Sequence, residues 1–310
     1  MASYLPATMQ AQVLTSFNAP YELTILPIPT PTDHDLLIKF AGTIVSAGPL
    51  AFSAMPSLRV GTRVGVPGRS YRPCTKCWEC TNNDDDPKGY SVACPKGENL
   101  GITRDGGFQQ YALVDVRQVA KIPDELTDVE AAPLMCAGLT IFSALLKCGL
   151  KEGGKVGIIG CGGGLGHLGL QFGVRMGFEV IGVDASDNAL KLARNLETKA
   201  KIFDARLTKT EAFQQGFDYG MNLLRNHGKC VVLSFPASGF QVSATDLVFR
   251  DVQVLGSLVG KNRVLKQMLA FAAEKNVRAV TRTYPLRELN ELVEVYKEGK
   301  GGKLVIDMTL

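Results

Sequence analysis

Short apolar and β-branched runs, divided by Pro and Gly, dominate roughly the first third of the chain. These β-prone runs lie at residues 9–14, 22–25, 36–40, 43–46 and 63–66. Helical periodicity is absent from this part of the chain. Closely spaced runs of this kind predict short strands joined by turns. The N-terminal part is therefore expected to be β-rich.

The pattern changes to a helical repeat of apolar residues at 128–146, with Thr127 placed to cap its start. After it, strand-like and helix-like runs alternate. The expected strands are 155–160, 179–184, 201–203, 229–234, 252–259, 277–284 and 303–308, and the expected helices are 165–176, 187–196, 211–225, 263–274 and 286–298. Such alternation predicts βαβ units and a parallel sheet. We expect an α/β domain from about residue 137, joined to the β-rich part by the first helix.

One strand is missing from this alternation. Between Asp204 and Gly228 there is no β-branched run, although a complete dinucleotide-binding fold has its fourth strand there, beside the first. Its loss would take a central neighbour from the sheet and expose backbone groups that the helices would have to cover.

Length and composition narrow the class of protein. The 310 residues, 45% of them apolar, suffice for about two domains, which excludes a disordered chain or a small disulfide scaffold. The net charge of +4 is scattered along the chain, unlike the concentrated basic face of a nucleic-acid binder. The N-terminus lacks the pattern of a secretory signal, and no apolar stretch is typical of a membrane helix. We expect a cytoplasmic protein that binds neither nucleic acid nor membranes.

Four of the eight cysteines cluster at Cys74, Cys77, Cys80 and Cys94. In the reducing cytosol such a cluster favours a metal site over disulfides. Tetrahedral zinc accepts four thiolates, so the spacing predicts a closed structural site without an open catalytic position. A redox C-x-x-C pair or unrelated thiols would be the alternative, but a redox pair needs no third and fourth cysteine.

A glycine-rich turn follows the first strand of the α/β domain. Its bare backbone could approach a pyrophosphate, whose charge the N–H groups of the following helix would stabilise. The candidate cofactor-binding residues are Gly160, Gly163, Gly164, Leu165, Gly166 and Asp184. A literal G-x-G-x-x-G occurs only at Gly164, Gly166 and Gly169, too late after the strand, so the interpretation depends on the context.

Asp184 ends the second strand, placed to accept hydrogen bonds from an adenosine ribose. No Lys or Arg follows it until Lys191, and a carboxylate there repels a 2′-phosphate, which favours NAD over NADP. The alternative is that the glycines only allow close helix–strand packing and that Asp184 is a solvated strand end.

Several ordered motifs resemble the zinc-containing alcohol dehydrogenases of the medium-chain dehydrogenase/reductase superfamily. Besides the cysteine cluster, the matching segments are 60–65, 105–108, 131–138, 163–167 and 256–260. The resemblance implies a GroES-like catalytic domain of residues 1–136 and 261–310, a Rossmann dinucleotide-binding domain of residues 137–260, and a homo-oligomer. It also implies NAD-dependent interconversion of small-molecule alcohols with aldehydes or ketones at a second, catalytic zinc, with Cys136 as the candidate catalytic residue and metal ligand.

The resemblance breaks at that catalytic zinc. Family members carry a Cys-His pair and a later Gly-His-Glu around it, whereas here Phe40 runs directly into Ala41, joining segments that the family separates. His34 matches no ligand position, and one thiolate cannot hold a catalytic zinc that needs about three protein ligands. Judged by its neighbours alone, Cys136 is interpreted as a small apolar residue on a buried helix face.

Three functions stay open at this point. The first is a zinc-type alcohol dehydrogenase-like oxidoreductase, favoured by the resemblance along the whole chain. The second is a zinc-independent NAD(P)H enone reductase of the same superfamily, disfavoured by the cysteine cluster. The third is a non-catalytic, zinc-stabilised paralogue that acts as a structural or dimer partner. The two internal deletions are consistent with a truncated gene model or with a paralogue that has abandoned redox catalysis.

Overall fold

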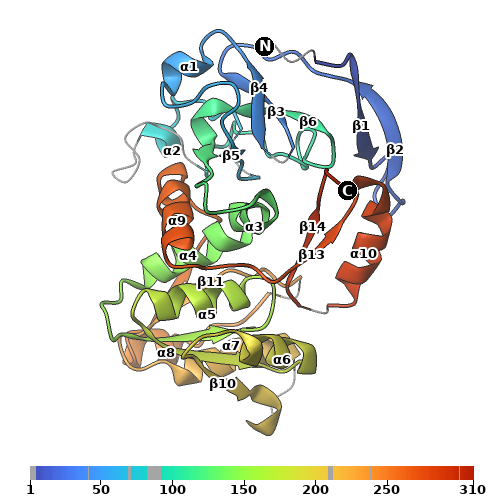
Figure 1. Cartoon of the computed structure of the whole chain (residues 1–310). Coiled ribbons are helices and arrows are strands. Elements are labelled where there is room, and N and C mark those ends of the chain that lie inside the picture. The colour runs from blue at the N-terminus through green and yellow to red at the C-terminus, as the bar shows by residue number, and fades with distance from the viewer. Residues whose placement is uncertain are drawn as a thin grey trace.

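The computed structural model describes residues 5–40, 42–68, 71–81, 92–208, 212–237, 239–299 and 301–310. Figure 1 shows a β-rich N-terminal part above a layered part of parallel strands and helices, with the C-terminal strands returning to the N-terminal hairpin. The class expected from the sequence, mixed α/β with a β-rich part and parallel strands, is confirmed.

Small antiparallel sheets build the N-terminal part. Strand β1 (Thr8–Val13) pairs with β2 (Glu22–Pro27), and β3 (Asp35–Lys39) lies between β4 (Thr43–Ala47) and β6 (Tyr111–Asp115). Strand β3 is almost completely buried because it has a neighbour on each edge and apolar residues on both faces. A further short pair joins β5 (Val64–Gly65) to β7 (Ala120–Lys121).

The β-rich part also contains short helical turns, although its sequence shows no helical periodicity. Helices α1 (Ala51–Ala54) and α2 (Trp78–Thr81) are single turns, and a 3-10 turn, η1, covers Val116–Gln118. One turn is too short to leave an apolar repeat in a sequence.

The single helix predicted at 128–146 is wrong. The structure has α3 (Asp128–Ala131), a 3-10 turn η2 (Ala132–Met135) and α4 (Ala137–Cys148), with a bend of 52° before α4. Pro133 lies at the start of the 3-10 turn and has no N–H to donate, so the α-helical bonding stops there. The cap is confirmed, because the Thr127 side chain accepts the N–H of Glu130 and the Glu130 side chain accepts the N–H of Thr127.

The parallel strands between residues 155 and 256 form two separate sheets. Strands β8 (Lys155–Ile159), β9 (Glu179–Asp184) and β10 (Lys201–Asp204) are arranged in the order β10-β9-β8, while β11 (Lys229–Val232) pairs only with β12 (Gln253–Gly256). Helices α5 (Gly166–Arg175) and α6 (Asp187–Asn195) cross between the strands of the first sheet.

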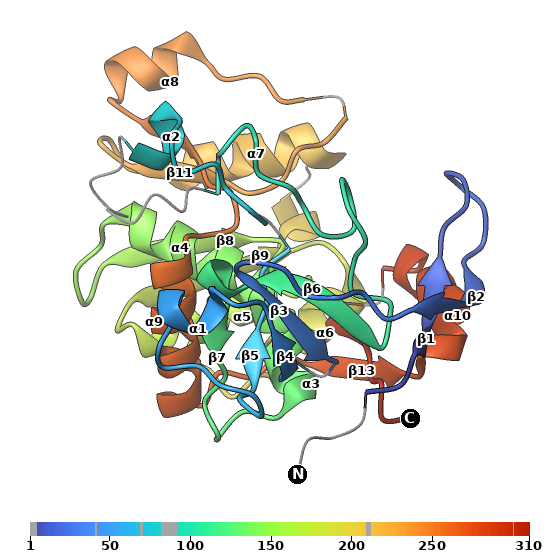
Figure 2. The ribbon, with the colours of Figure 1, turned by 90° about the horizontal axis from the view of Figure 1, so that it is seen from above.

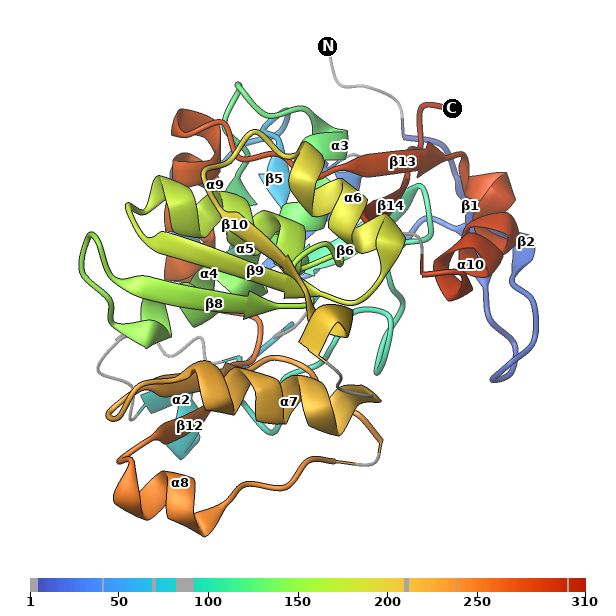
Figure 3. The same cartoon turned by 90° about the horizontal axis from the view of Figure 1, so that it is seen from below.

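The missing fourth strand explains this division. Among the described residues between β10 and β11 there is a 3-10 turn η3 (Ala205–Thr208) and helix α7 (Ala212–Leu223), but no strand. Helix α7 packs on β8, with Gly216 and Gly220 against Ile159. Figure 3 shows α7 between the β8 side of the first sheet and β12. Strand β8 therefore forms the edge of a sheet where the complete fold would continue.

The last third of the chain returns to the N-terminal hairpin. It contains α8 (Ala244–Phe249), α9 (Asn262–Glu274), β13 (Thr281–Tyr284), a 3-10 turn η4 (Leu286–Glu288), α10 (Leu289–Lys297) and β14 (Lys303–Ile306). Strands β13 and β14 are parallel partners. The Gln12 side chain donates to the Leu286 carbonyl at 2.9 Å, and Tyr21 and Asn290 exchange two hydrogen bonds.

The strands predicted at 252–259 and 277–284 are shorter than expected, because each has a single, short strand neighbour. Strand β12 ends at Gly256 with the end of β11, and β13 begins only at Thr281, opposite the start of β14. The largest hydrophobic cluster lies where α4, α5 and α9 meet, with the rings of Phe142 and Phe172 5.1 Å apart. Figure 2 shows these helices side by side beneath the N-terminal strands. No single helix among the described residues is long and apolar enough to cross a membrane; the bent pair of α3–η2 and α4 reaches that length only in combination and belongs to this core.

Candidate functional site

The four clustered cysteines converge on one point. Their sulfur atoms all lie within 4.8 Å of one another, and Cys80 and Cys94 are buried. Within the described part of the chain, this is the one group of three or more His, Cys, Asp or Glu side chains that could hold a metal ion. Four thiolates with this proximity suit a tetrahedral zinc.

Backbone geometry prepares the cluster for a cation. The N–H of Cys77 donates to the sulfur of Cys74, and the N–H of Cys74 donates to the sulfur of Cys94, each at 3.3 Å. Hydrogen bonds from the backbone of Lys76 and Cys77 lower the pKa of the Cys74 thiol to about 6. The deprotonated sulfur, which is the form that binds metals, is therefore favoured at neutral pH.

Cys136 lies apart from this cluster and is exposed, at the N-cap of α4. The interpretation of Cys136 as a residue on a buried helix face is therefore wrong. The reason is the break at Pro133, which ends the preceding helix and turns Cys136 out of the apolar repeat. No group of metal-ligand side chains includes Cys136 among the described residues.

The three histidines do not complete a site around Cys136. His167 is fully buried and uses both ring nitrogens, and His227 is exposed and bonded to Asp251 at 2.8 Å. His34 lies in the turn before β3, where its carbonyl accepts the N–H of Val116. The side chains within the described part of the chain therefore do not fit a catalytic zinc.

A short turn joins β3 and β4, at the junction where the resemblance would place most of the catalytic-zinc ligands. Strands β3 and β4 form a hairpin in which Ile38 pairs with Ile44 and Lys39 with Thr43. The N–H of Gly42 donates to the Lys39 carbonyl at 2.8 Å, and Ala41 lies outside the described residues. The two strands thus pair up to residues 39 and 43, and only three residues lie between these partners.

The glycine-rich turn follows β8 directly, and three of its positions favour or require glycine. Gly160 has a φ of 75°, which favours glycine. A Cβ at Gly166 would lie 2.1 Å from the Gly160 carbonyl oxygen, and one at Gly162 would lie 1.9 Å from that of Ala189. Both contacts are far too close, so these positions require glycine. Gly162 is not among the candidate residues chosen from the sequence, because its close approach to Ala189 arises only in the folded chain.

Asp184 lies at the edge of this turn. One of its oxygens accepts the N–H of Gly162 at 3.0 Å, and the other accepts the N–H groups of Ala185 and Ser186. The carboxylate lies at the end of β9 and is partly exposed, so its oxygens can accept further hydrogen bonds. This arrangement could accept hydrogen bonds from a ribose.

A cation that sequence spacing does not reveal lies near this edge. Asp204 is the register partner of Asp184 on the neighbouring strand, and Arg206 follows two residues later. The Arg206 guanidinium bonds Asp204 at 2.7 Å and Asp187 at 2.6 Å. Two carboxylates therefore surround this arginine, and hydrogen bonds from Arg206 lower the pKa of Asp204 to about 2.

A second missed residue is Lys303, which arrives from the far end of the sequence. A Cβ at Gly164 would lie 3.1 Å from Cδ of Lys303 and 3.6 Å from its ammonium nitrogen, and one at Gly301 would lie 3.1 Å from the Gly162 carbonyl oxygen. The start of β14 therefore packs on the glycine-rich turn. The lysine could complement an anion bound there, but its distance in sequence gave no signal.

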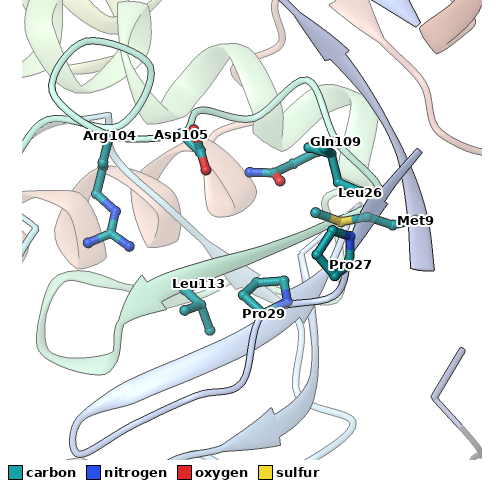
Figure 4. Close-up of a pocket in the computed structure, with 8 residues that line it drawn as sticks. All are labelled: Met9, Leu26, Pro27, Pro29, Arg104, Asp105, Gln109 and Leu113. Atoms are coloured by element: carbon teal, nitrogen blue, oxygen red, sulfur yellow. The ribbon is translucent and has the colours of Figure 1, made fainter. Parts of the chain in front are cut away.

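A cavity of about 270 Å³ lies elsewhere, between the β1–β2 hairpin and the loop before β6 (Figure 4). Apolar side chains of Met9, Leu26 and Leu113 line it, with Asp105 and Gln109 on the loop side. Neither Cys136 nor the glycine-rich turn contributes to its lining.

The fold and the two sites define a medium-chain dehydrogenase architecture. Residues 15–124 match the family model described as alcohol dehydrogenase GroES-like domain, and residues 164–274 match the model described as zinc-binding dehydrogenase. The chain is 34% identical to an alcohol dehydrogenase of Geobacillus stearothermophilus over 269 residues, which cover 81% of this chain and 77% of that protein. The chain belongs to the zinc-containing alcohol dehydrogenase family, a family of oxidoreductases.

A second relative shows how much shorter this chain is. This chain is 28% identical to an alcohol dehydrogenase of a Moraxella species over 350 aligned positions, which cover 97% of this chain and 100% of the relative. The alignment exceeds the 310 residues of this chain by 40 positions. At least that many residues of the relative have no counterpart here.

Solved structures show the same fold. Acetophenone reductase from Geotrichum candidum, in complex with NAD, matches with a TM-score of 0.78 at 23% identity, covering 98% of each chain. The CAD structure from Helicobacter pylori, complexed with NADP(H), matches with a TM-score of 0.80 at 20% identity, covering 98% of this chain and 99% of that one. The expected GroES-like and Rossmann architecture is thereby confirmed, and relatives of this fold bind either dinucleotide.

Proposed function

We propose that this chain is a zinc-stabilised, NAD-binding member of the alcohol dehydrogenase family in which the catalytic zinc site has been lost. The observation that carries the proposal is the contrast between two sets of residues. The four cysteine sulfur atoms lie close enough to hold one ion, and the glycine-rich turn is bent tightly. Cys136, in contrast, has no second metal-ligand side chain near it among the described residues. The rate at which this chain converts small-molecule alcohols or carbonyl compounds, the substrates named for its relatives, should therefore be low.

The proposed dinucleotide site consists of Gly160, Gly163, Gly164, Leu165, Gly166 and Asp184. The turn offers the N–H groups at the start of α5 to a pyrophosphate, and Lys303 supplies a positive charge over Gly164. Asp184 would accept the adenosine ribose hydroxyls. Because Asp187 and Asp204 neutralise the nearby Arg206, the site favours NAD over NADP.

The proposed zinc ligands are Cys74, Cys77, Cys80 and Cys94, which fit a structural ion without an open position. A zinc there folds its own loop and takes no part in hydride transfer. Cys136 retains the family position of a catalytic ligand, but a single exposed thiol cannot hold an open zinc site.

We further propose that residues 1–136 and 261–310 form the catalytic domain and residues 137–260 the dinucleotide-binding domain. Hydrogen bonds from Gln12 and Tyr21 to the C-terminal segment support this division, because they attach residues 286–290 to the N-terminal hairpin. A homo-oligomer remains part of the proposal by family.

Elemental analysis and an NADH fluorescence titration of the same preparation test the proposed function. We expect one zinc per chain and saturable NADH binding. Two zincs per chain with NADH binding would instead indicate a complete alcohol dehydrogenase site and contradict the proposed loss. One zinc without NADH binding would instead support a purely structural or partner role.

A further inference from the structure

His167 is fully buried in the first turn of α5, and both of its ring nitrogens are engaged. Nδ1 lies 2.9 Å from the Gly163 carbonyl oxygen, and the N–H of Val280 donates to Nε2 at 3.1 Å. A backbone carbonyl only accepts and a backbone N–H only donates. These two partners therefore require a neutral ring with its proton on Nδ1.

Gln171 repeats this arrangement one helical turn later, on the same face of α5. Its side-chain nitrogen donates to the Arg278 carbonyl at 2.7 Å, and its oxygen accepts the Arg278 N–H at 3.1 Å. Residues 278 and 280 are alternate positions of one segment, just before β13 begins. Side chains of α5 thus supply hydrogen bonds that a neighbouring strand would normally supply.

The connection continues to the C-terminal strand. The Val280 carbonyl accepts the N–H of Lys303 at 2.8 Å, and Lys303 in turn lies over Gly164. A closed circuit therefore runs from the glycine-rich turn through His167 to Val280, then to Lys303 and back to the turn. Among the described residues, His167 joins the two halves of this circuit from a position without access to solvent.

We propose that His167 is a positioning residue, which together with Gln171 fixes the glycine-rich turn and the β13–β14 pair in one arrangement, so that dinucleotide binding and the order of this C-terminal pair are coupled. The coupling to a dinucleotide rests on the proposed NAD site. The hydrogen-bond bridge itself belongs to the unliganded protein and can be tested there.

The charges around the ring give the bridge a pH dependence. Burial lowers the pKa of His167, the Gly163 carbonyl opposes this effect, and the positive charge of Lys303 lowers the pKa further. The other nearby cation, Arg278, directs its guanidinium to Glu130 at 2.9 Å. Protonation of Nε2 would remove the acceptor for the Val280 N–H and place two cations together. The bridge should therefore open as the solution becomes acidic.

Two substitutions separate the bridge from simple core packing. In His167→Asn the amide reaches only the position of Nδ1, so the Gly163 partner can be kept while the Val280 partner is lost. In His167→Gln the amide oxygen reaches the position of Nε2 and can still accept the Val280 N–H, but it cannot be protonated in this pH range. Gln171→Leu removes both bonds to Arg278 while leaving His167 in place.

The experiment combines hydrogen exchange of the unliganded protein with NADH titrations at pH 7.5 and 5.5. We expect His167→Asn to speed exchange of residues 278–284 and 301–306 and to weaken NADH binding about tenfold at pH 7.5, as for a lost buried hydrogen bond. His167→Gln should bind within about threefold of the unmodified protein and lose less affinity at pH 5.5. Gln171→Leu should speed exchange of the same segments.

Equal impairment of the Asn and Gln variants would overturn the proposal, because it would indicate packing rather than the bridge. Unchanged exchange in His167→Asn and Gln171→Leu would overturn it as well. Failure of the unmodified protein to bind NADH would refute the NAD site instead, while the exchange rates of the unliganded variants would still decide whether His167 joins these segments. If His167→Asn does not fold, Gln171→Leu decides the same question.

Discussion

The Asp184 carboxylate lies 3.0 Å from the backbone nitrogen of Gly162 and accepts its N–H. The acid proposed to meet the ribose therefore also fixes the turn proposed to meet the pyrophosphate. The proposed cofactor selectivity and the shape of the turn would thus depend on the same side chain.

Substituting Asp184 with alanine should bring the affinities for NADH and NADPH closer together. The unmodified protein should prefer NADH by at least about tenfold, because the carboxylate repels a 2′-phosphate, and the variant should show a preference below about threefold. Fluorescence titrations with both dinucleotides measure this. An unmodified protein that prefers NADPH would contradict the role given to Asp184.

Releasing Arg206 from a carboxylate should also favour NADPH, in this case by attraction of the 2′-phosphate. Asp204→Asn removes one of the two carboxylates that bind this guanidinium, so NADPH should bind several-fold more tightly, on the order of one charged hydrogen bond, with little change for NADH. Asp307→Asn makes the same substitution at an acid remote from Arg206 and is the matched control. Equal NADPH binding in both variants would show that Arg206 does not reach the 2′-phosphate.

Adding one methyl group to the turn should be costly at Gly162. Gly162→Ala places a Cβ 1.9 Å from the Ala189 carbonyl oxygen, so the backbone must shift, at a cost of about 3 kcal/mol in the free energy of unfolding together with loss of NADH binding. Gly157→Ala on β8 has open space and should leave both nearly unchanged. Urea unfolding and NADH titration compare the two. Equal stability would indicate a turn looser than described.

The strands, helices and cysteine cluster followed from sequence because they depend on local patterns. The βα alternation, the Thr127 cap and the missing strand after Asp204 all leave a signal within about twenty residues. The contacts of Lys303 with the turn, and of Arg206 with Asp187, arise only when distant segments meet, so no local pattern reports them. The burial of Cys136 was predicted wrongly because the apolar repeat continues across Pro133, whereas the α-helix is interrupted there.

Loss of one thiol should release the zinc. Cys94→Ser should reduce zinc from one per chain to a small fraction and lower the unfolding temperature, because binding energy at such sites, on the order of 10 kcal/mol, contributes to folding. Cys230→Ser, at a half-buried cysteine outside the cluster, should keep its zinc. Elemental analysis of both proteins is the measurement, and full zinc content in Cys94→Ser would refute the ligand set.

Acid should destabilise the protein partly through Asp35. Burial raises the pKa of this carboxyl, but hydrogen bonds from Tyr71, Thr32 and Arg72 outweigh it and lower the pKa below 3.8. The stability from these bonds is therefore present above pH 3.8 and is lost as pH falls through the lowered pKa. Tyr71→Phe removes the bond of 2.6 Å and should cost about 1–3 kcal/mol at neutral pH, with a smaller loss on acidification.

Urea unfolding between pH 7 and 3 tests this, with the exposed Tyr296→Phe as the control. Equal losses in the two Phe variants would show that the hydrogen bond from the Tyr71 hydroxyl to Asp35 contributes nothing.

The most direct test of the lost catalytic site is the oxidation of primary and secondary alcohols with NAD by the zinc-loaded protein, compared with its Cys136→Ala variant. Polarising an alcohol oxygen requires a metal held by about three protein ligands, and Cys136 has no such companions among the described residues. We predict no zinc-dependent turnover above background and no difference between the two proteins. Robust turnover that disappears on addition of a chelator and in Cys136→Ala would contradict the loss and show that other residues complete the site.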